Sequence, residues 1–225
     1  MGQARFRVGS LLDVSRNAID WAGRRAARSI LHITFVSSIA LGAMPAFAQE
    51  LSSAARDLTF IIRELQDNKG LPYVVVDKLE ARVFVFNGRG ALVASTAALL
   101  GLARGDHSVP GIGDRPLAQI RPEERTTPAG RFLTEPGRNA TGEHVIWIDY
   151  DAALSIHRLR DGQNQRLNQR LLSATPLDNR TSYGCVTVPV AFYESIIKPV
   201  FSASRGVVYI MPETMPWRRV FDFEG

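Results

Sequence analysis

A single cysteine stands in this chain, within the block Ser182-Tyr183-Gly184-Cys185-Val186-Thr187. A thiol attacks as the thiolate, so a catalytic cysteine needs a base or a cationic neighbour. His157 meets this need best, because it stands on a strand-like segment just before the polar stretch that leads to Cys185. Gly184 allows the backbone to approach a substrate closely, so peptide N–H groups there can face a developing oxyanion. These residue types predict acyl transfer by a cysteine–histidine pair.

The same residue types could instead bind zinc. Such a site would combine Cys185 with His157, His144 and His107. The chain has none of the short Cys-x-x-Cys or His-x-x-x-His pairs that are typical of zinc modules. We therefore predict no metal site and keep zinc as an alternative use of Cys185. A buried apolar cysteine without a role is the second alternative.

The first 48 residues have the pattern of a secretory leader, which bears on the compartment of the thiol. Six arginines and two aspartates precede residue 29, and residues 29–48 contain no Asp, Glu, Lys or Arg. A basic segment, an apolar run and a final Ala46-Phe47-Ala48 follow one another as in a signal peptide, with cleavage after Ala48. The alternative is an uncleaved membrane anchor at residues 30–48, since about 20 apolar residues can span a bilayer. We expect an exported protein of the periplasm or cell envelope.

Export changes what the charge and the cysteine imply. The whole chain carries a formal charge of +5, and most of this charge lies in the leader. The remaining chain is nearly neutral, so its composition gives no support for a nucleic-acid partner. An exported chain with one cysteine has no internal disulfide, and a free thiol there is a liability unless it is buried or used.

The elements that must position these residues are one helix and a β-rich domain. Residues 49–70 predict an amphipathic helix, which either packs on the outside of the domain or binds a partner. The domain covers residues 71–225, and Asn87-Gly88 gives it a hairpin signal. Its aromatic C-terminal tail is expected to pack back on it. Strands are predicted at residues 73–76, 81–86, 91–97, 131–135, 143–150, 153–158, 186–188 and 206–211.

Two long segments and one helix separate these strands. Residues 99–127 are rich in glycine and proline, and a connection this long is often functional. They form either a lid or groove wall over the site or a tolerated surface insertion. Residues 160–181 predict a polar loop or a short helix. Pro189 suits the first turn of a helix that runs to about Lys198, and Pro199 is expected to kink or end it.

The motifs resemble the catalytic domain of the L,D-transpeptidases (YkuD-type). The resemblance is carried by Ser182 to Thr187, by His157 upstream, and by Thr127-Pro128-Ala129-Gly130-Arg131-Phe132 earlier still. In that family a histidine and a loop precede Ser/Thr-His-Gly-Cys, and a Thr-Pro-x-Gly-x-Phe turn comes before them. The resemblance covers residues 71–211. It implies a mainly β, sandwich-like fold with the thiol under a flap.

The resemblance also implies acyl transfer on peptidoglycan stem peptides, without a metal or cofactor. Cys185 would attack the carbonyl between the third residue and the D-Ala that follows. His157 would take the thiol proton and later protonate the leaving amine, while backbone N–H groups of Gly184 and Cys185 hold the oxyanion. The amine of a second stem, or an envelope protein, would then accept the acyl group. Carbapenems would acylate Cys185.

Three positions and one interval depart from the family pattern, and the interval is the 24 residues between His157 and Ser182, which is longer than is common in the family. Tyr183 stands where the family usually has histidine, Thr187 replaces asparagine or arginine, and Arg158 stands where small residues are usual. With Ser182, these residues are predicted to contact the substrate, and their identities leave the acyl acceptor open. One alternative is a hydrolase on the same scaffold, with L,D-carboxypeptidase or amidase-like activity. The other is a non-catalytic wall-binding module, which retention of both the cysteine and the histidine disfavours.

Overall fold

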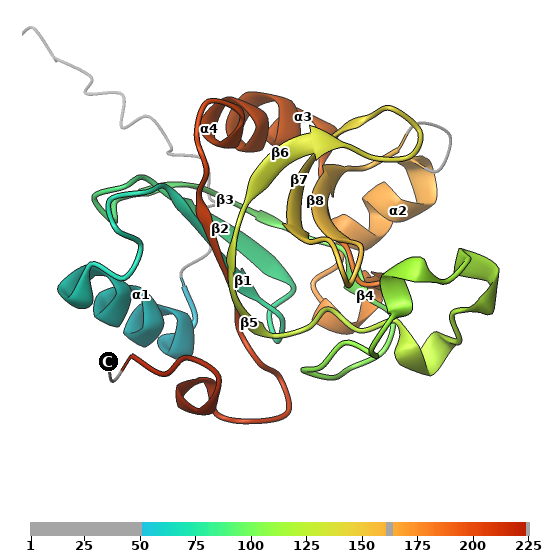
Figure 1. Ribbon diagram of the computed structural model, residues 1–225, viewed down its shortest axis with the longest axis horizontal. Helices are drawn as coiled ribbons and strands as arrows, with labels where there is room; N and C mark the ends of the chain where they lie inside the picture. The colour runs from blue at the N-terminus through green and yellow to red at the C-terminus, as the bar shows by residue number, and fades with distance from the viewer. Residues whose placement is uncertain (1–50, 161–163, 224–225) are drawn as a thin grey trace, which may run out of the picture. The chain divides into compact units, whose positions relative to one another are not determined.

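The computed structural model describes residues 51–160 and 164–223. The predicted leader, including the alternative anchor at residues 30–48, lies outside the described residues. Within the described ranges, no helix combines the length and apolar character needed to cross a membrane. A five-stranded sheet, a four-stranded sheet, a two-stranded sheet and several helices make up this part of the chain (Figure 1).

The first sheet contains five strands, and most of them were predicted from the sequence. Their order is β3 (Leu92–Ala97), β2 (Arg82–Phe86), β1 (Tyr73–Asp77), β11 (Val207–Ile210) and β5 (Gly130–Leu133). β1 runs parallel to β11, and the other neighbours are antiparallel. The hairpin prediction is confirmed, because Asn87 Oδ1 accepts hydrogen bonds from the N–H groups of Arg89 and Ala91 between β2 and β3.

The second sheet contains four strands, in the order β10 (Val186–Val188), β8 (Leu154–Arg158), β7 (His144–Asp149) and β6 (Glu135–Arg138). β8 and β10 are parallel, whereas β6, β7 and β8 are antiparallel neighbours. β6 was not predicted, because Pro136 and Gly137 both disfavour a strand interior. Pro136 is tolerated because β6 is the edge strand of its sheet.

The main core lies between the five-stranded and the four-stranded sheet. Side chains of a strand alternate between its faces, so Val74 and Val76 of β1 pack with Ile146 and Ile156 of the second sheet. The opposite face of the first sheet is also buried, with Tyr73 and other residues packed in a second cluster. The predicted mainly β, sandwich-like fold class is therefore confirmed.

A helix and the C-terminal tail cover the outer face of the first sheet. α1 (Ser53–Leu65) begins after Ser52, whose hydroxyl accepts the N–H of Ala55 at 3.1 Å. Its buried residues pack in the same cluster as Trp217 and Phe221 of the tail, which includes the 3₁₀ turn η6 (Trp217–Arg219). The predictions that the helix packs on the domain and that the aromatic tail returns to it are both confirmed.

The helix after the cysteine block continues past its predicted end near Lys198. Of the two effects predicted for Pro199, a kink or the end of the helix, the structure excludes the end. It comprises α3 (Val190–Phe192), the π-helical turn η5 (Tyr193–Ile197) and α4 (Lys198–Ser202). Proline lacks the N–H that an α-helix interior uses. The wider π turn just before Pro199 changes the hydrogen-bond register there and lets the chain remain helical.

The two long segments lie against each other. Residues 99–127 contain β4 (Leu100–Gly101) and the 3₁₀ turns η1 (Ile112–Asp114), η2 (Leu117–Gln119) and η3 (Pro122–Glu124). The polar segment contains α2 (Asn164–Leu171), the 3₁₀ turn η4 (Pro176–Asn179) and β9 (Arg180–Ser182). β4 and β9 pair in parallel. This pairing brings both segments beside the chain that enters the cysteine block.

Candidate active site

The strand register places the thiol and the imidazole on one face of β8 and β10. Thr187 pairs with His157 and Val186 with Ile156, so Cys185 comes opposite Ser155. Cys185 and Thr187 point to the same face because side chains two apart on a strand do so. The Sγ atom of Cys185 lies 3.7 Å from Ser155 Oγ and 3.4 Å from the carbonyl oxygen of Ala153.

The imidazole of His157 is oriented by the backbone. Its Nδ1 lies 2.8 Å from the carbonyl oxygen of Arg158. A carbonyl oxygen only accepts hydrogen bonds, so Nδ1 carries a proton and Nε2 is the atom free to exchange a proton. Nε2 lies 3.3 Å from Thr187 Oγ1. The structure thus places Thr187 beside the candidate base.

Each of the two groups shifts the pKa of the other towards the charged form. Burial alone would raise the pKa of the Cys185 thiol, but the hydrogen bond and charge of His157, with hydrogen bonds from Ser155, lower it. Burial alone would lower the pKa of His157, but the hydrogen bond and charge of Cys185 and the carbonyl of Arg158 raise it. A thiolate beside an imidazolium is the reactive form of a cysteine nucleophile.

A small hydrogen-bonded ring shapes the turn before the cysteine. Ser182 Oγ donates to the carbonyl oxygen of Cys185 at 2.7 Å and accepts the N–H of Gly184 at 3.1 Å. Gly184 has a φ of 137°, and a Cβ there would meet the carbonyl oxygen of Thr126 at 2.7 Å. Glycine is therefore required for the close approach of two backbone segments. The predicted substrate contact Ser182 and the predicted oxyanion donor Gly184 both hold this turn.

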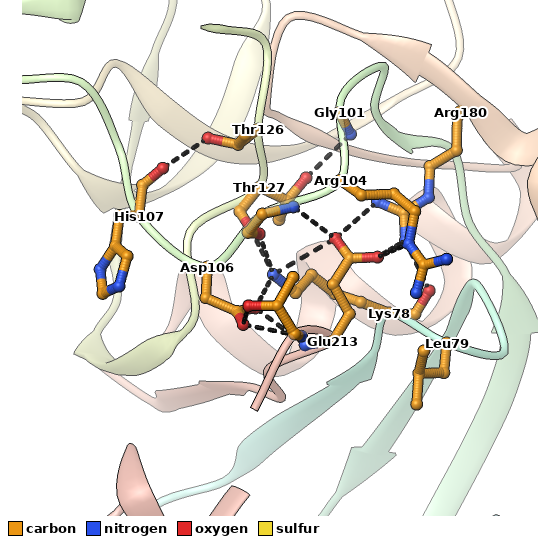
Figure 2. Close-up of polar contacts among 12 residues, drawn as sticks. Lys78, Leu79, Gly101, Arg104, Asp106, His107, Thr126, Thr127, Arg180 and Glu213 are labelled. Carbon is orange, nitrogen blue, oxygen red and sulfur yellow. Dashed lines mark hydrogen bonds and ion pairs between the residues drawn. The ribbon is translucent and has the colours of Figure 1, made fainter. Parts of the chain in front are cut away.

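Thr127, from the predicted Thr-Pro turn, supports the turn before Cys185 through hydrogen bonds of its side chain, which we call the Thr127 brace. Its side chain is fully buried, and its hydroxyl donates to the carbonyl oxygen of Gly184 at 2.7 Å. The same hydroxyl accepts the N–H of Gly101 in β4 at 2.8 Å (Figure 2). One side chain thus connects residues 99–127 to the nucleophile turn.

A buried ionic cluster, formed by Lys78, Asp106, Glu213 and Arg180, contacts the backbone of Thr127. The ammonium of Lys78 donates to Asp106 Oδ1 and to the carbonyl oxygen of Thr127, each at 2.8 Å (Figure 2). Glu213 Oε1 lies 3.6 Å from the same ammonium, and Glu213 also pairs with Arg180 at 2.5 Å. Because the charges are compensated, the cluster is tolerated inside the fold. The segment at residues 99–127 is therefore tied to the domain at its base.

The remaining predicted substrate contacts are Tyr183 and Arg158, and both side chains contact other side chains of the protein. Tyr183 is exposed, and the guanidinium carbon of Arg125 lies 4.0 Å from its ring centroid. This stacking joins Arg125, near the end of residues 99–127, to the nucleophile turn. The guanidinium of Arg158 lies 3.6 Å from Glu143 and 3.9 Å from Glu194. Its carbonyl, rather than its side chain, contacts the candidate base.

The structure does not gather the four residues of the alternative zinc site. His144 Nδ1 lies 2.9 Å from the hydroxyl of Tyr193, and its Nε2 lies 3.2 Å from Ser202 Oγ. His107 lies on the other segment, where its carbonyl accepts from Thr126. Among the described residues, no three His, Cys, Asp or Glu side chains are grouped so that they could hold a metal ion. The described residues therefore do not form the four-residue zinc site.

Sequence reasoning missed two residues of this site. Ser155 stands two positions before His157 on a predicted strand, so the two-residue period places both on one face and could have found it. Thr127 was part of a quoted motif, but its contact with Gly184 joins positions far apart in the chain. The sequence gives no signal for that contact.

No protein-family model matches this chain, and no curated protein matches it. Several solved structures are similar. A mutant of the helical cell shape determining protein Pgp2 from Campylobacter jejuni is 14% identical with a TM-score of 0.44, over 65% of this chain and 48% of that one. The catalytic domain of the E. faecium L,D-transpeptidase is 19% identical with a TM-score of 0.34, over 62% and 95%.

A third similar structure is the L,D-transpeptidase from Xylanimonas cellulosilytica, residues 123–326. It is 14% identical with a TM-score of 0.39, over 62% of this chain and 60% of that one. The chain thus spans about half of the length of the Pgp2 protein and under two thirds of this enzyme. Identities and TM-scores this low do not assign the chain to a family.

Proposed function

We propose that this protein is an exported cysteine acyltransferase that acts on peptidoglycan stem peptides, as an L,D-transpeptidase does. The observation that carries the proposal is the pairing of β8 and β10, which sets His157 and Cys185 on one face. The lowered pKa of Cys185 and the raised pKa of His157 support a thiolate–imidazolium pair at that place. The sequence motif supplies the substrate class.

The first half-reaction forms a thioester. The thiolate of Cys185 attacks the carbonyl carbon between the third stem residue and D-Ala, after His157 Nε2 has taken the thiol proton. The resulting oxyanion is held by backbone N–H groups of the nucleophile turn. The N–H of Gly184 can join in only after it leaves Ser182 Oγ, which it contacts at 3.1 Å. Nε2 then gives its proton to the departing amine, and D-Ala leaves.

The second half-reaction returns the enzyme. An amine of a second stem, or of an envelope protein, attacks the thioester carbonyl and loses a proton to His157. The carbon–sulfur bond breaks, and the thiolate of Cys185 is restored beside the imidazolium. Throughout, the proton stays on Nδ1, which donates it in a hydrogen bond to the carbonyl oxygen of Arg158, so one tautomer of the ring serves both steps. Water in place of the amine would give the hydrolase.

Incubation with a tetrapeptide donor stem tests this function. The proposal predicts a cross-linked dimer and free D-Ala, and predicts that Cys185→Ala and His157→Gln abolish both products. His144→Gln is the matched control, since that ring contacts Tyr193 and Ser202 instead. Free D-Ala without dimer would favour the hydrolase. Products from the Cys185→Ala protein would rule out the thiol mechanism.

A further inference from the structure

A cavity of about 440 Å³ lies along the strand that leads into the nucleophile turn. The residues that line it are Leu102, Arg166, Leu167, Arg170, Arg180 and Thr181. β9 ends at Ser182, and the carbonyl of Ser182 accepts the N–H of Leu102 at 3.0 Å. The cavity therefore adjoins the chain that carries Cys185, and its volume lies within the range of ligand sites.

Three arginines and no carboxylate line this cavity. Arg180 is only 8% exposed, and Glu213 compensates its charge from the neighbouring buried cluster (Figure 2). Arg170 donates to the backbone carbonyl of Asp178 at 2.8 Å, a contact that brings no negative charge. Within residues 51–160 and 164–223, neither Arg166 nor Arg170 forms an ion pair. Two guanidinium groups are thus left to meet an anion from outside.

The remaining lining residues limit the kind of anion. Leu102 and Leu167 add apolar surface to the cavity, which suits a ligand with carbon skeleton beside its charge rather than a small hydrated ion. A guanidinium is planar and presents paired N–H groups that match the two oxygens of a carboxylate. A smaller neighbouring cavity of about 290 Å³ is lined by Glu213 together with Lys78, so it lacks this one-sided charge.

We propose that the cavity lined by Arg166 and Arg170 binds a free carboxylate of an acidic peptide substrate. The proposal rests on the proposed function, because stem peptides are the substrates whose carboxylates would reach it. Binding there would fix the stem along β9 while its scissile carbonyl lies at Cys185. The arginines would act by positioning the substrate and would take no part in proton transfer.

Binding of a synthetic acidic tetrapeptide stem to the full chain carrying Cys185→Ala tests the site by calorimetry. Hydrogen bonds from the two guanidinium groups to a carboxylate are charge-assisted and therefore strong. Arg166→Gln together with Arg170→Gln should therefore raise the Kd about ten-fold or more. Amidation of the peptide carboxylates should raise it similarly. Removal of two charges elsewhere, by Arg56→Gln with Arg89→Gln, is the matched control and should leave the Kd unchanged.

Three outcomes would overturn the proposal. The first is an unchanged Kd in the Arg166 and Arg170 variant. The second is equal binding of the amidated and the free peptide. The third is displacement of the peptide by inorganic phosphate at the same concentration at which a second acidic peptide displaces it. Steady-state turnover with Cys185 intact separates a failure of this site from a failure of the proposed function. If the protein cross-links stems and the Arg166 and Arg170 variant keeps both KM and kcat, the proposed function stands and the carboxylate site is refuted. The proposal predicts a raised KM at nearly constant kcat.

Discussion

The replacement Thr127→Val removes the two hydrogen bonds by which Thr127 supports the turn before Cys185. Valine keeps the shape of the side chain and removes the hydroxyl, which donates to the Gly184 carbonyl at 2.7 Å and accepts the Gly101 N–H at 2.8 Å. Both partners are buried. An unsatisfied buried polar group costs about 1–3 kcal/mol, so the free energy of unfolding should fall by about 2–6 kcal/mol.

Urea unfolding, followed by tryptophan fluorescence, measures this change. Thr127→Ser is the matched control, because it keeps the hydroxyl and loses one methyl group, worth about 1 kcal/mol. Because the brace holds the turn before Cys185, the valine protein should also react more slowly with iodoacetamide under native conditions. A loss of stability below 1 kcal/mol for the valine protein, or equal losses for both variants, would refute the assigned role of the hydroxyl.

Two further predictions concern pH. His157→Gln should shift iodoacetamide alkylation of Cys185 to higher pH, because the imidazolium that lowers the thiol pKa is removed while burial, which raises it, remains; an unchanged pH–rate profile would contradict the ion pair. Burial alone would raise the pKa of Asp106, but hydrogen bonds from Lys78, Thr214 and the Glu213 backbone lower it to about 2. This carboxylate therefore contributes stability that is present above the unfolded pKa of about 3.9 and lost as pH falls towards 2. Asp106→Asn should flatten the stability–pH curve in that window, as urea unfolding at a series of pH values would show, and an equally steep curve would contradict this.

The strands of the first sheet were predictable because their side chains are constrained locally. Tyr73 to Val76 are β-branched or aromatic, and Asn87-Gly88 fixes the hairpin that follows the next strand. The same local logic located Cys185 and His157, since each stands on or beside a short apolar strand. The pairing of β8 with β10, which sets them on one face, is a long-range event that the sequence left implicit.

The buried ionic cluster could not be predicted. Lys78, Asp106 and Glu213 are far apart in the chain, and a charged residue in a polar stretch is normally solvated. Only the folded chain shows that their charges compensate one another at 2.8 and 3.6 Å from the Lys78 ammonium. Through these contacts the cluster ties residues 99–127 to the domain near the candidate site. The sequence predicted this segment as a lid or groove wall or as a tolerated insertion.

The most direct test of the account is the mass of the protein after a short incubation with a tetrapeptide donor and an acid quench. The account predicts a covalent adduct, equal to the donor less D-Ala, on the peptide that contains Cys185. The adduct should be absent from Cys185→Ala and should disappear when an acceptor amine is added before the quench. Release of D-Ala by the intact protein without any adduct on Cys185, or an adduct on another residue, would contradict the central claim that this thiol is the nucleophile.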